Sequence, residues 1–276
     1  MRATFATKAG SPDRATEDWV LVSSDLAVVL DGATARTDTG CVHGVAWYSH
    51  QLGAAIVANA AIRASNLAGG VAHAIDQVAR LHPQCDLSHP GTPSAAVGVV
   101  RAVGTILEYL VLGDVTVAVQ TFTGMSVVTD DRVSHTAQPA RTEAERLPIG
   151  SPEKAAALLE MKHGELAVRN KLGGYWVAAN DPGAIEHAYT GQLPLDQVRG
   201  VAILTDGAAR AIAPFDLCDW PGALTLLEGS GPAELIRQVR DAEARDPAGL
   251  RWPRNKRSDD ATAVYLNRID PQPSGD

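Results

Sequence analysis

Short runs of alternating apolar and polar residues occupy the first thirty positions of the chain, a pattern typical of β-strands. Turn-forming Gly, Pro and Asp residues separate these runs, and the predicted strands are residues 3–7, 19–22 and 26–30. After them, apolar residues recur at helical spacing. This spacing predicts an Ala-rich helix over about 42–67, ended by Gly69 and Gly70, and a second helix over about 71–81.

The middle of the chain is rich in β-branched residues and short turns, which predict strands at about 94–101, 105–112, 115–121 and 126–129. Because the links between these strands are too short for crossover helices, we expect an antiparallel meander. Further strands are predicted at 175–179, 201–205 and 261–266, and helices over about 207–246 with breaks near 221 and 229–232. Strands and helices in this order predict an α+β fold.

The chain has 276 residues, of which 45% are hydrophobic, enough for one domain with a full core. We expect a single domain over 1–270, with a polar, flap-like excursion at about 131–172 and a frayed tail over 271–276. Within the excursion, Ser151 followed by Pro152 predicts a helix start. The N-terminus lacks the apolar stretch of a signal peptide, and no run approaches ~18 apolar residues. We therefore expect a cytoplasmic monomer that does not associate with a membrane.

The charge of the chain disfavours some partners. The 32 acidic residues exceed the 24 basic ones and give a net charge of −8, so we expect no nucleic-acid partner. Arg outnumbers Lys by 19 to five, which hints at a bacterial genome rich in G and C. The cysteines, Cys41, Cys85 and Cys218, form no Cys-x-x-Cys pair or other zinc spacing. We expect each of them to be a small apolar residue.

Several acidic residues stand at the ends of predicted strands. Asp31 and Asp206 each end an apolar run and precede a Gly, Asp114 follows Gly113, and Asp259 introduces the last strand. One Asp-Gly pair alone is a turn signal. Together, however, neighbouring strand ends would bring carboxylates close, and their repulsion would raise their pKa values unless cations bind. Mg²⁺ or Mn²⁺ with oxygen ligands would satisfy such a site.

The sequence resembles the metal-dependent protein phosphatases of the type 2C (PPM) family. The resemblance is carried, in the family's order, by Arg-Ala-Thr-Glu-Asp at 14–18, Val-Val-Leu-Asp-Gly at 28–32, Leu-Gly-Asp at 112–114, Leu-Thr-Asp-Gly at 204–207 and Asp-Asp-Ala-Thr at 259–262. It implies a four-layer α-β-β-α sandwich of two antiparallel sheets flanked by helices. It also implies a Mn²⁺- or Mg²⁺-dependent serine/threonine phosphatase that uses a metal-activated water and forms no phosphoenzyme.

The resemblance also implies roles for individual residues. Asp31 would bridge two divalent ions, Asp206 and Asp259 would complete one of them, and Asp114 would contribute to a third, weaker site. The other ion of the pair would lie near the Gly32 carbonyl and Glu17 or Asp18. The resemblance thus implies that Asp31, Asp206 and Asp259 are catalytic. The full set of implied metal ligands is Glu17, Asp18, Asp31, Gly32, Asp114, Asp206 and Asp259.

The remaining implied residues surround these ligands. Arg14 resembles the phosphate-holding Arg but lies one residue nearer to the acidic pair than in most members, so Arg36 is a second candidate. The His that often follows the Asp-Gly of the family is Ala33-Thr34 here. His43 is therefore the candidate general acid. The alternative is that His43 makes a structural hydrogen bond at the start of a helix. Asp260 is a candidate acid beside the metal ligands. Residues 131–172 fall where the family carries a flap that governs substrate choice.

Other phosphatase chemistries lack their residues. No Cys-x5-Arg, P-loop, HExxH or GxSxG motif occurs, and neither Asp31 nor Asp206 has a second Asp two residues later. Three hypotheses stay open: a phosphatase of phosphorylated proteins, a phosphatase of a small phosphorylated metabolite, and a weakly active or inactive phosphatase-like module that binds or regulates a partner. The retained acidic residues favour an active enzyme.

Overall fold

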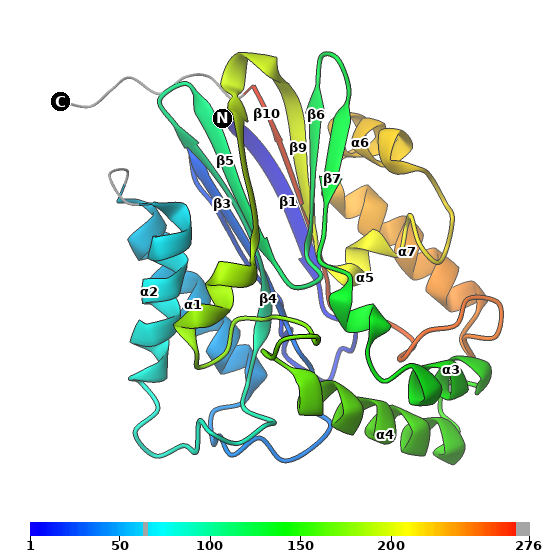
Figure 1. Cartoon of the computed structure of the whole chain (residues 1–276). Helices are drawn as coiled ribbons and strands as arrows, with labels where there is room; N and C mark the ends of the chain where they lie inside the picture. The colour runs from blue at the N-terminus through cyan, green and yellow to red at the C-terminus, as the bar shows by residue number, and fades with distance from the viewer. Residues whose placement is uncertain (63–65, 269–276) are drawn as a thin grey trace.

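Two antiparallel sheets stack face to face in the computed structural model, which describes residues 1–62 and 66–268. Helices cover the outer face of each sheet (Figure 1). The α+β fold and the four-layer arrangement predicted above are therefore confirmed. The expected tail at 271–276 lies outside the described residues.

The strands divide equally between the sheets in the described part of the chain. In spatial order, the first sheet contains β2 (Trp19–Val22), β3 (Leu26–Gly32), β4 (Ala95–Val103), β5 (Ile106–Leu112) and β8 (Tyr189–Pro194). The second contains β1 (Arg2–Lys8), β10 (Ala261–Asn267), β9 (Val198–Leu204), β6 (Thr116–Thr121) and β7 (Met125–Val128).

Strand alternation explains the layers. In β3, Val28 and Leu30 face one side and pack against helices, whereas Val29 faces the other side and packs against the second sheet. The helices over the first sheet are α1 (Val45–Ala60) and α2 (Leu67–Ala79). Those over the second sheet are α5 (Asp206–Ala209), α6 (Trp220–Gly229) and α7 (Pro232–Arg245). No helix among residues 1–62 and 66–268 combines the length and apolar content needed to cross a membrane.

Residues 131–172 fold largely into helices beside the sandwich. They contain the 3-10 helix η1 (Arg132–His135), α3 (Gln138–Arg146) and α4 (Pro152–Val168), and two further 3-10 helices lie later in the chain, η2 (Pro182–His187) and η3 (Leu195–Gln197). Ser151 caps α4 as predicted, because its hydroxyl accepts a hydrogen bond from the Lys154 N–H at 3.1 Å. The buried Lys154 ammonium donates to the Ala144 and Leu147 carbonyls at 2.6 and 2.9 Å. It thereby satisfies the C-terminal end of α3 and ties the two helices together.

The helix predicted over about 42–67 is too long, because α1 spans only Val45–Ala60. α1 ends at Ala60, and α2 begins at Leu67 with Asn66 as its cap, so the glycines at 69–70 lie inside α2. The Asn66 side chain accepts a hydrogen bond from the Ala68 N–H at 2.9 Å, a local start signal that outweighs the helix-breaking tendency of the glycines. The junction at 63–65 lies outside the described residues.

Two strand predictions are also wrong. The expected meander divides after β5, because β6 pairs with β9 and β7 in the second sheet. The strand predicted at 175–179 forms only isolated bridges. There the Asn170 side chain takes the place of a neighbouring strand, since it bonds the Val177 N–H and carbonyl at 2.9 and 3.0 Å. The alternation of apolar and polar residues identifies an extended segment but not the strand with which it pairs. The sequence pattern also failed to predict the exposed edge strand β8.

We predict that Gly53→Ala destabilises the fold. An added Cβ at this position of α1 would lie 2.2 Å from a ring atom of Trp19, so the helix must move away from β2 at a cost of about 1–3 kcal/mol. Gly69→Ala in α2 is the matched control, because nothing lies within 4 Å of its added Cβ. It should be neutral or stabilising by up to about 1 kcal/mol. Urea unfolding of the two variants measures the difference, and equal midpoints would contradict this packing.

Candidate active site

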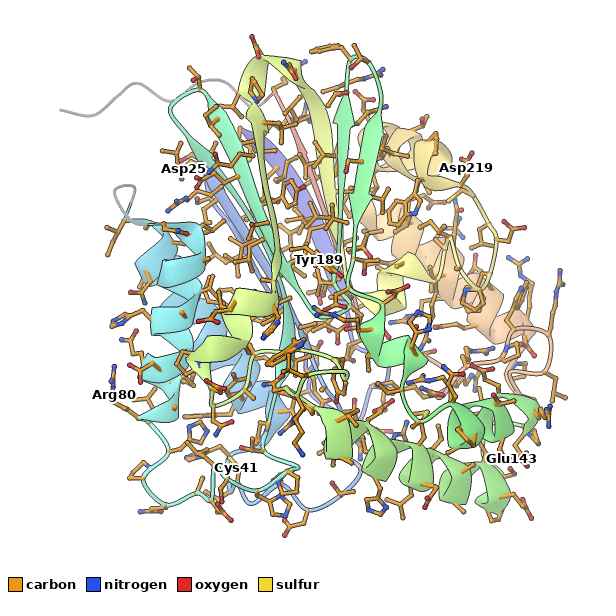
Figure 2. All side chains as sticks on the ribbon, in the orientation of Figure 1. Asp25, Cys41, Arg80, Glu143, Tyr189 and Asp219 are labelled. Atoms are coloured by element: carbon orange, nitrogen blue, oxygen red, sulfur yellow. The ribbon has the colours of Figure 1, made fainter. Side chains whose placement is uncertain are left out.

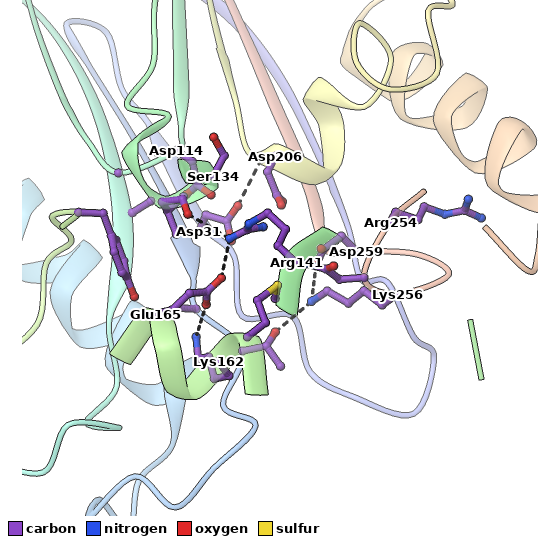
Figure 3. Close-up of a pocket in the computed structure, with 18 of the residues that line it drawn as sticks. Asp31, Asp114, Ser134, Arg141, Lys162, Glu165, Asp206, Arg254, Lys256 and Asp259 are labelled. Carbon is purple, nitrogen blue, oxygen red and sulfur yellow. Dashed lines mark hydrogen bonds and ion pairs between the residues drawn. The ribbon is translucent and has the colours of Figure 1, made fainter. Parts of the chain in front are cut away.

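Four acidic residues meet at one end of the two sheets and line a cleft of about 390 Å³ (Figure 3). Asp31 lies at the end of β3, Asp114 follows β5, Asp206 follows β9 and Asp259 precedes β10. The strand register explains the convergence within each sheet. Leu30 pairs with Val97, which pairs with Leu112, while Leu204 pairs with Ala263. The structure therefore brings together the four aspartates that the sequence pattern singled out.

Burial and mutual repulsion dominate the electrostatics of this cleft. Burial, followed by the charge of Asp206, raises the pKa of Asp31 well above its ordinary value. The same two causes raise the pKa of Asp114 to about 7. The pKa of Asp206 is also raised, by burial and by Asp259. A direct contact joins the sheets here, because the Asp206 N–H donates to Asp31 Oδ2 at 3.3 Å.

Asp18 is buried close to Asp31 and Asp206, and one of its oxygens has no hydrogen-bond partner among the described residues. Its Oδ2 accepts hydrogen bonds from the hydroxyls of Thr262 and Thr205 at 2.7 and 3.0 Å. Its Oδ1 is buried and has no hydrogen-bond partner in the described part of the chain. A buried carboxylate oxygen without a partner is costly, and a nearby divalent cation would satisfy it. The all-oxygen donor set thus fits a hard cation.

Glu17 and Asp260 lie beside the aspartates. Glu17 Oε2 accepts a hydrogen bond from the hydroxyl of Thr34, a residue of the cleft wall, at 2.5 Å. Asp260 accepts bonds from the backbone N–H groups of Gly10 and Glu17 at 2.8 and 2.6 Å. It therefore fastens the segment that carries Glu17 and Asp18 to the start of β10.

The glycines after Asp31 and Asp206 have a steric role. An added Cβ on Gly32 would lie 2.6 Å from the Glu17 carbonyl oxygen, and one on Gly207 would overlap the Asp260 carbonyl oxygen. Each glycine therefore lets the backbone of a neighbouring acidic segment approach closely. These contacts bring the Asp-Gly turns against Glu17 and Asp260.

Asp259 differs from the other three aspartates because cations pair with both of its oxygens. Arg210 donates to Oδ2 at 3.0 Å, and the Lys256 ammonium lies 2.5 Å from Oδ1. Arg210 in turn pairs with buried Glu243 at 2.8 Å, and Arg240 holds the other oxygen of Glu243. Asp259 is therefore held by a buried ion-pair network, whereas Asp31, Asp114 and Asp206 form no ion pair with another described residue.

Helices α3 and α4 supply a cationic wall on the other side of the cleft (Figure 3). Arg141 and Lys162 both face Glu165, with nitrogen–oxygen distances of 2.8 and 3.7 Å. The sequence reasoning missed these three residues, and also Arg210 and Lys256. Lys256 stands in a basic run three positions before Asp259, which was a usable signal. Arg141 and Glu165 are 24 positions apart on two helices, and no sequence pattern joins them.

The structure does not bring every predicted site residue into the cleft. Arg36 lines it. Arg14 is exposed and is absent from the residues that line the cleft. His43 lies apart from the aspartates, where its ring contacts Cys41 and Cys85.

Comparison with known proteins rests on the fold. No known family model and no curated protein matches this sequence. Among solved structures, the PPM Ser-Thr phosphatase MsPP from Mycobacterium smegmatis aligns over 97% of this chain and 98% of its own, with 18% identity and a TM-score of 0.55. The chain has the PPM phosphatase fold.

Two other structures with the PPM fold align over nearly the whole chain. The serine/threonine phosphatase Stp1 from Staphylococcus aureus has 13% identity and a TM-score of 0.56, and covers 96% of this chain and 94% of its own. The catalytic domain of the serine/threonine phosphatase PstP, in complex with two manganese ions, has 14% identity and a TM-score of 0.53, with coverages of 96% and 97%.

We predict that Asp114→Asn stabilises the metal-free protein at neutral pH. Between the ordinary pKa of 3.8 and the folded value of about 7, the folded chain binds more protons than the unfolded one at this residue, so stability falls as pH rises through that window. The variant lacks this pH-dependent loss, so its free energy of unfolding should exceed that of the wild type by about 1–2 kcal/mol at pH 7.5 in EDTA. The gain should shrink towards pH 4.

Thermal unfolding at several pH values, with and without excess Mn²⁺, measures this effect. Exposed Asp196, on η3, provides the control variant Asp196→Asn. In Mn²⁺ the order should reverse, because the wild-type carboxylate gains a cation that the amide holds less well. Equal pH dependence of wild type and Asp114→Asn in EDTA would contradict the raised pKa.

Proposed function

We propose that this chain is a metal-dependent phosphomonoester hydrolase that acts on phosphorylated serine and threonine in proteins. The observation that carries the proposal is the convergence of Asp31, Asp114 and Asp206 beside buried Asp18, at the strand ends of a PPM fold. Such a cluster of desolvated carboxylates is unfavourable without cations. The PstP complex with two manganese ions supports a divalent-metal requirement.

In this proposal, Asp31, Asp206 and Asp259 hold two divalent ions, with the Gly32 carbonyl, Glu17 and Asp18 on the side of one ion. Asp114 serves a third, weaker ion. Divalent ions in such a site activate water for attack on phosphorus and neutralise phosphate charge. Thr205 and Thr262 fix the orientation of the Asp18 carboxylate through their hydroxyls, and Asp260 fixes the backbone that carries it.

The substrate would enter between the aspartates and residues 131–172, which we propose as a flap over the single domain. Arg141 and Lys162 are placed to hold phosphate oxygens, and Arg36 stands at the same cleft. An Arg can hold two phosphate oxygens at once. Because Glu165 pairs with both Arg141 and Lys162, it would keep their side chains extended into the cleft until phosphate arrives.

One observation favours the alternative of a regulatory or binding module. Both oxygens of Asp259 are already paired, with Arg210 and Lys256, so this corner of the cleft is neutralised without a metal. A chain that binds a phosphorylated group without hydrolysing it would keep that arrangement. A small phosphorylated metabolite as substrate is the further alternative, which the assay below separates.

We predict that hydrolysis of p-nitrophenyl phosphate and of a phosphothreonine peptide requires Mn²⁺ or Mg²⁺ and is lost in EDTA. Asp206→Ala should lower kcat/KM by about 10²-fold or more, because losing a metal ligand removes several kcal/mol of transition-state stabilisation. Asp196→Ala should retain full activity. Metal-independent turnover, or full activity of Asp206→Ala, would exclude the proposed mechanism. Phosphate binding without turnover would favour the binding module, and turnover of sugar or nucleotide phosphates alone would favour the metabolite.

We also predict that Arg141→Met raises KM for the phosphothreonine peptide about tenfold with a smaller effect on kcat, because a charged hydrogen bond to phosphate is worth about 1.5–3 kcal/mol. Arg146→Met is the matched control, since Arg146 is an exposed residue of the same helix and is not among the cleft-lining residues. The double variant Arg141→Met, Glu165→Gln controls for a stranded Glu165 charge. Equal KM values for the two single variants would remove Arg141 from the phosphate site.

A further inference from the structure

Two loops far from each other in sequence meet below α1 and α2, and Figure 2 labels Cys41 in the first of them. The first loop joins β3 to α1, and the second joins α2 to β4. A backbone hydrogen bond connects them, because the Asp86 N–H donates to the Gly40 carbonyl at 2.9 Å. Their contact gathers four side chains with sulfur or nitrogen donors: Cys41, His43, His82 and Cys85.

Three of these donors are spaced like the corners of a tetrahedral zinc site. Cys41 Sγ and Cys85 Sγ are 3.6 Å apart, and they lie 3.6 and 3.5 Å from His43 Nδ1. With Zn–S bonds of about 2.3 Å and Zn–N bonds of about 2.0–2.1 Å, tetrahedral ligands stand about 3.8 Å apart for two sulfurs and about 3.6 Å for sulfur and nitrogen. The observed separations therefore match before any ion is bound.

His82 supplies the fourth donor, and its orientation is fixed. Its Nδ1 lies 2.9 Å from the Val78 carbonyl oxygen, to which it donates. Its Nε2 is buried and has no hydrogen-bond partner within residues 1–62 and 66–268, and the residue is only 4% exposed. A zinc-ligating His commonly donates its other ring N–H to such a carbonyl. The ligand atoms of Cys41, His43 and His82 all lie within 4.8 Å of one another.

Trp47 holds both imidazoles in place. The His43 ring stacks on the Trp47 ring at a centroid distance of 4.1 Å, and the His82 ring meets Trp47 edge-on at 4.7 Å. This aromatic contact limits the rotation of the two rings. It also places a fluorescent side chain directly against the cluster.

We propose that Cys41, His43, His82 and Cys85 form a structural Zn²⁺ site, separate from the aspartate cleft. Four protein ligands of the Cys₂His₂ type close the coordination sphere, as in structural rather than catalytic zinc sites. The thiolate and imidazole donors prefer Zn²⁺, whereas the carboxylates of the cleft suit Mn²⁺ or Mg²⁺.

This assignment corrects the expectation that the cysteines have no zinc spacing. Each half of the site pairs one Cys with one His, as Cys-x-His at 41–43 and His-x-x-Cys at 82–85. Counting cysteines alone therefore misses it. The site would also tie down the loop that carries Thr34 and Arg36, two residues of the cleft wall.

The test titrates the reduced, metal-free full-length chain with Co²⁺, which reports thiolate ligands through charge-transfer absorption in the near ultraviolet. Wild type should show this absorption at one Co²⁺ per chain, with tetrahedral d–d bands and a change in Trp fluorescence, and one equivalent of Zn²⁺ should abolish the absorption. Cys41→Ser, Cys85→Ser and His82→Gln should each weaken Zn²⁺ binding at least tenfold. Cys218→Ser should bind like wild type, because Cys218 lies on the other side of the molecule among the residues around α6.

Asp206→Ala separates this site from the proposed active site, since it should keep the thiolate absorption even if it binds no Mn²⁺. Should a ligand variant fail to fold, the spectrum of the wild-type chain decides alone. Stoichiometric Co²⁺ without thiolate absorption would overturn the assignment. So would a Cys41–Cys85 disulfide found by peptide mapping of the protein purified under reducing conditions, or equal rates of thiol labelling of wild type with and without Zn²⁺.

Discussion

The repulsion among desolvated carboxylates at one end of the sandwich is the constraint to which the rest of the structure responds. Asp18, Asp31, Asp114 and Asp206 all have raised pKa values, with burial as the leading cause. On a flexible scaffold, these carboxylates would move apart and become hydrated. Here the strands that carry them are fixed by a Val- and Ala-rich layer between the sheets and by helices outside both. The rigid, close-packed layers thus store an unfavourable arrangement that a bound cation would relieve.

The compensating cations are distributed unevenly, and this unevenness locates the unbalanced charge. Arg210 and Lys256 neutralise Asp259, and Glu243 with Arg240 supports Arg210 from behind. Among the described residues, Asp31 receives only the backbone N–H of Asp206. On the side of α3 and α4, Glu165 offsets much of the charge of Arg141 and Lys162. The uncompensated negative charge therefore lies over Asp31, Asp114 and Asp18, where a divalent cation would be attracted most strongly.

The sequence predicted the acidic side of the cleft well because local pattern carries that information: an apolar run fixes a strand, and the residue after it lies at the edge of the sheet. The side of the cleft formed by α3 and α4 could not be predicted in this way. Arg141 meets Glu165 only because Lys154 and a small apolar cluster hold α3 against α4. Such contacts depend on tertiary packing, as do the sheet exchange after β5 and the replacement of a strand by the Asn170 side chain. The short acidic motifs were visible in the sequence, and the layer order followed from the family resemblance that these motifs carry, whereas partners at long sequence separation could not be predicted.

Under the zinc assignment, the loop between β3 and α1 would separate two metal chemistries. Asp31 and Gly32 precede it with oxygen donors, and Cys41 and His43 end it with sulfur and nitrogen donors. Zn²⁺ binds most ligand sets more tightly than Mn²⁺ does, so affinity alone would not keep zinc out of the cleft. A closed site of soft donors on the same loop would take up the first equivalent of Zn²⁺ and leave the carboxylates to the harder ion. Zinc bound at the end of the loop, by Cys41 and His43, would then restrict the movement of Thr34 and Arg36 at its start. The thiolates would thus affect the geometry of the cleft without contacting a ligand bound there.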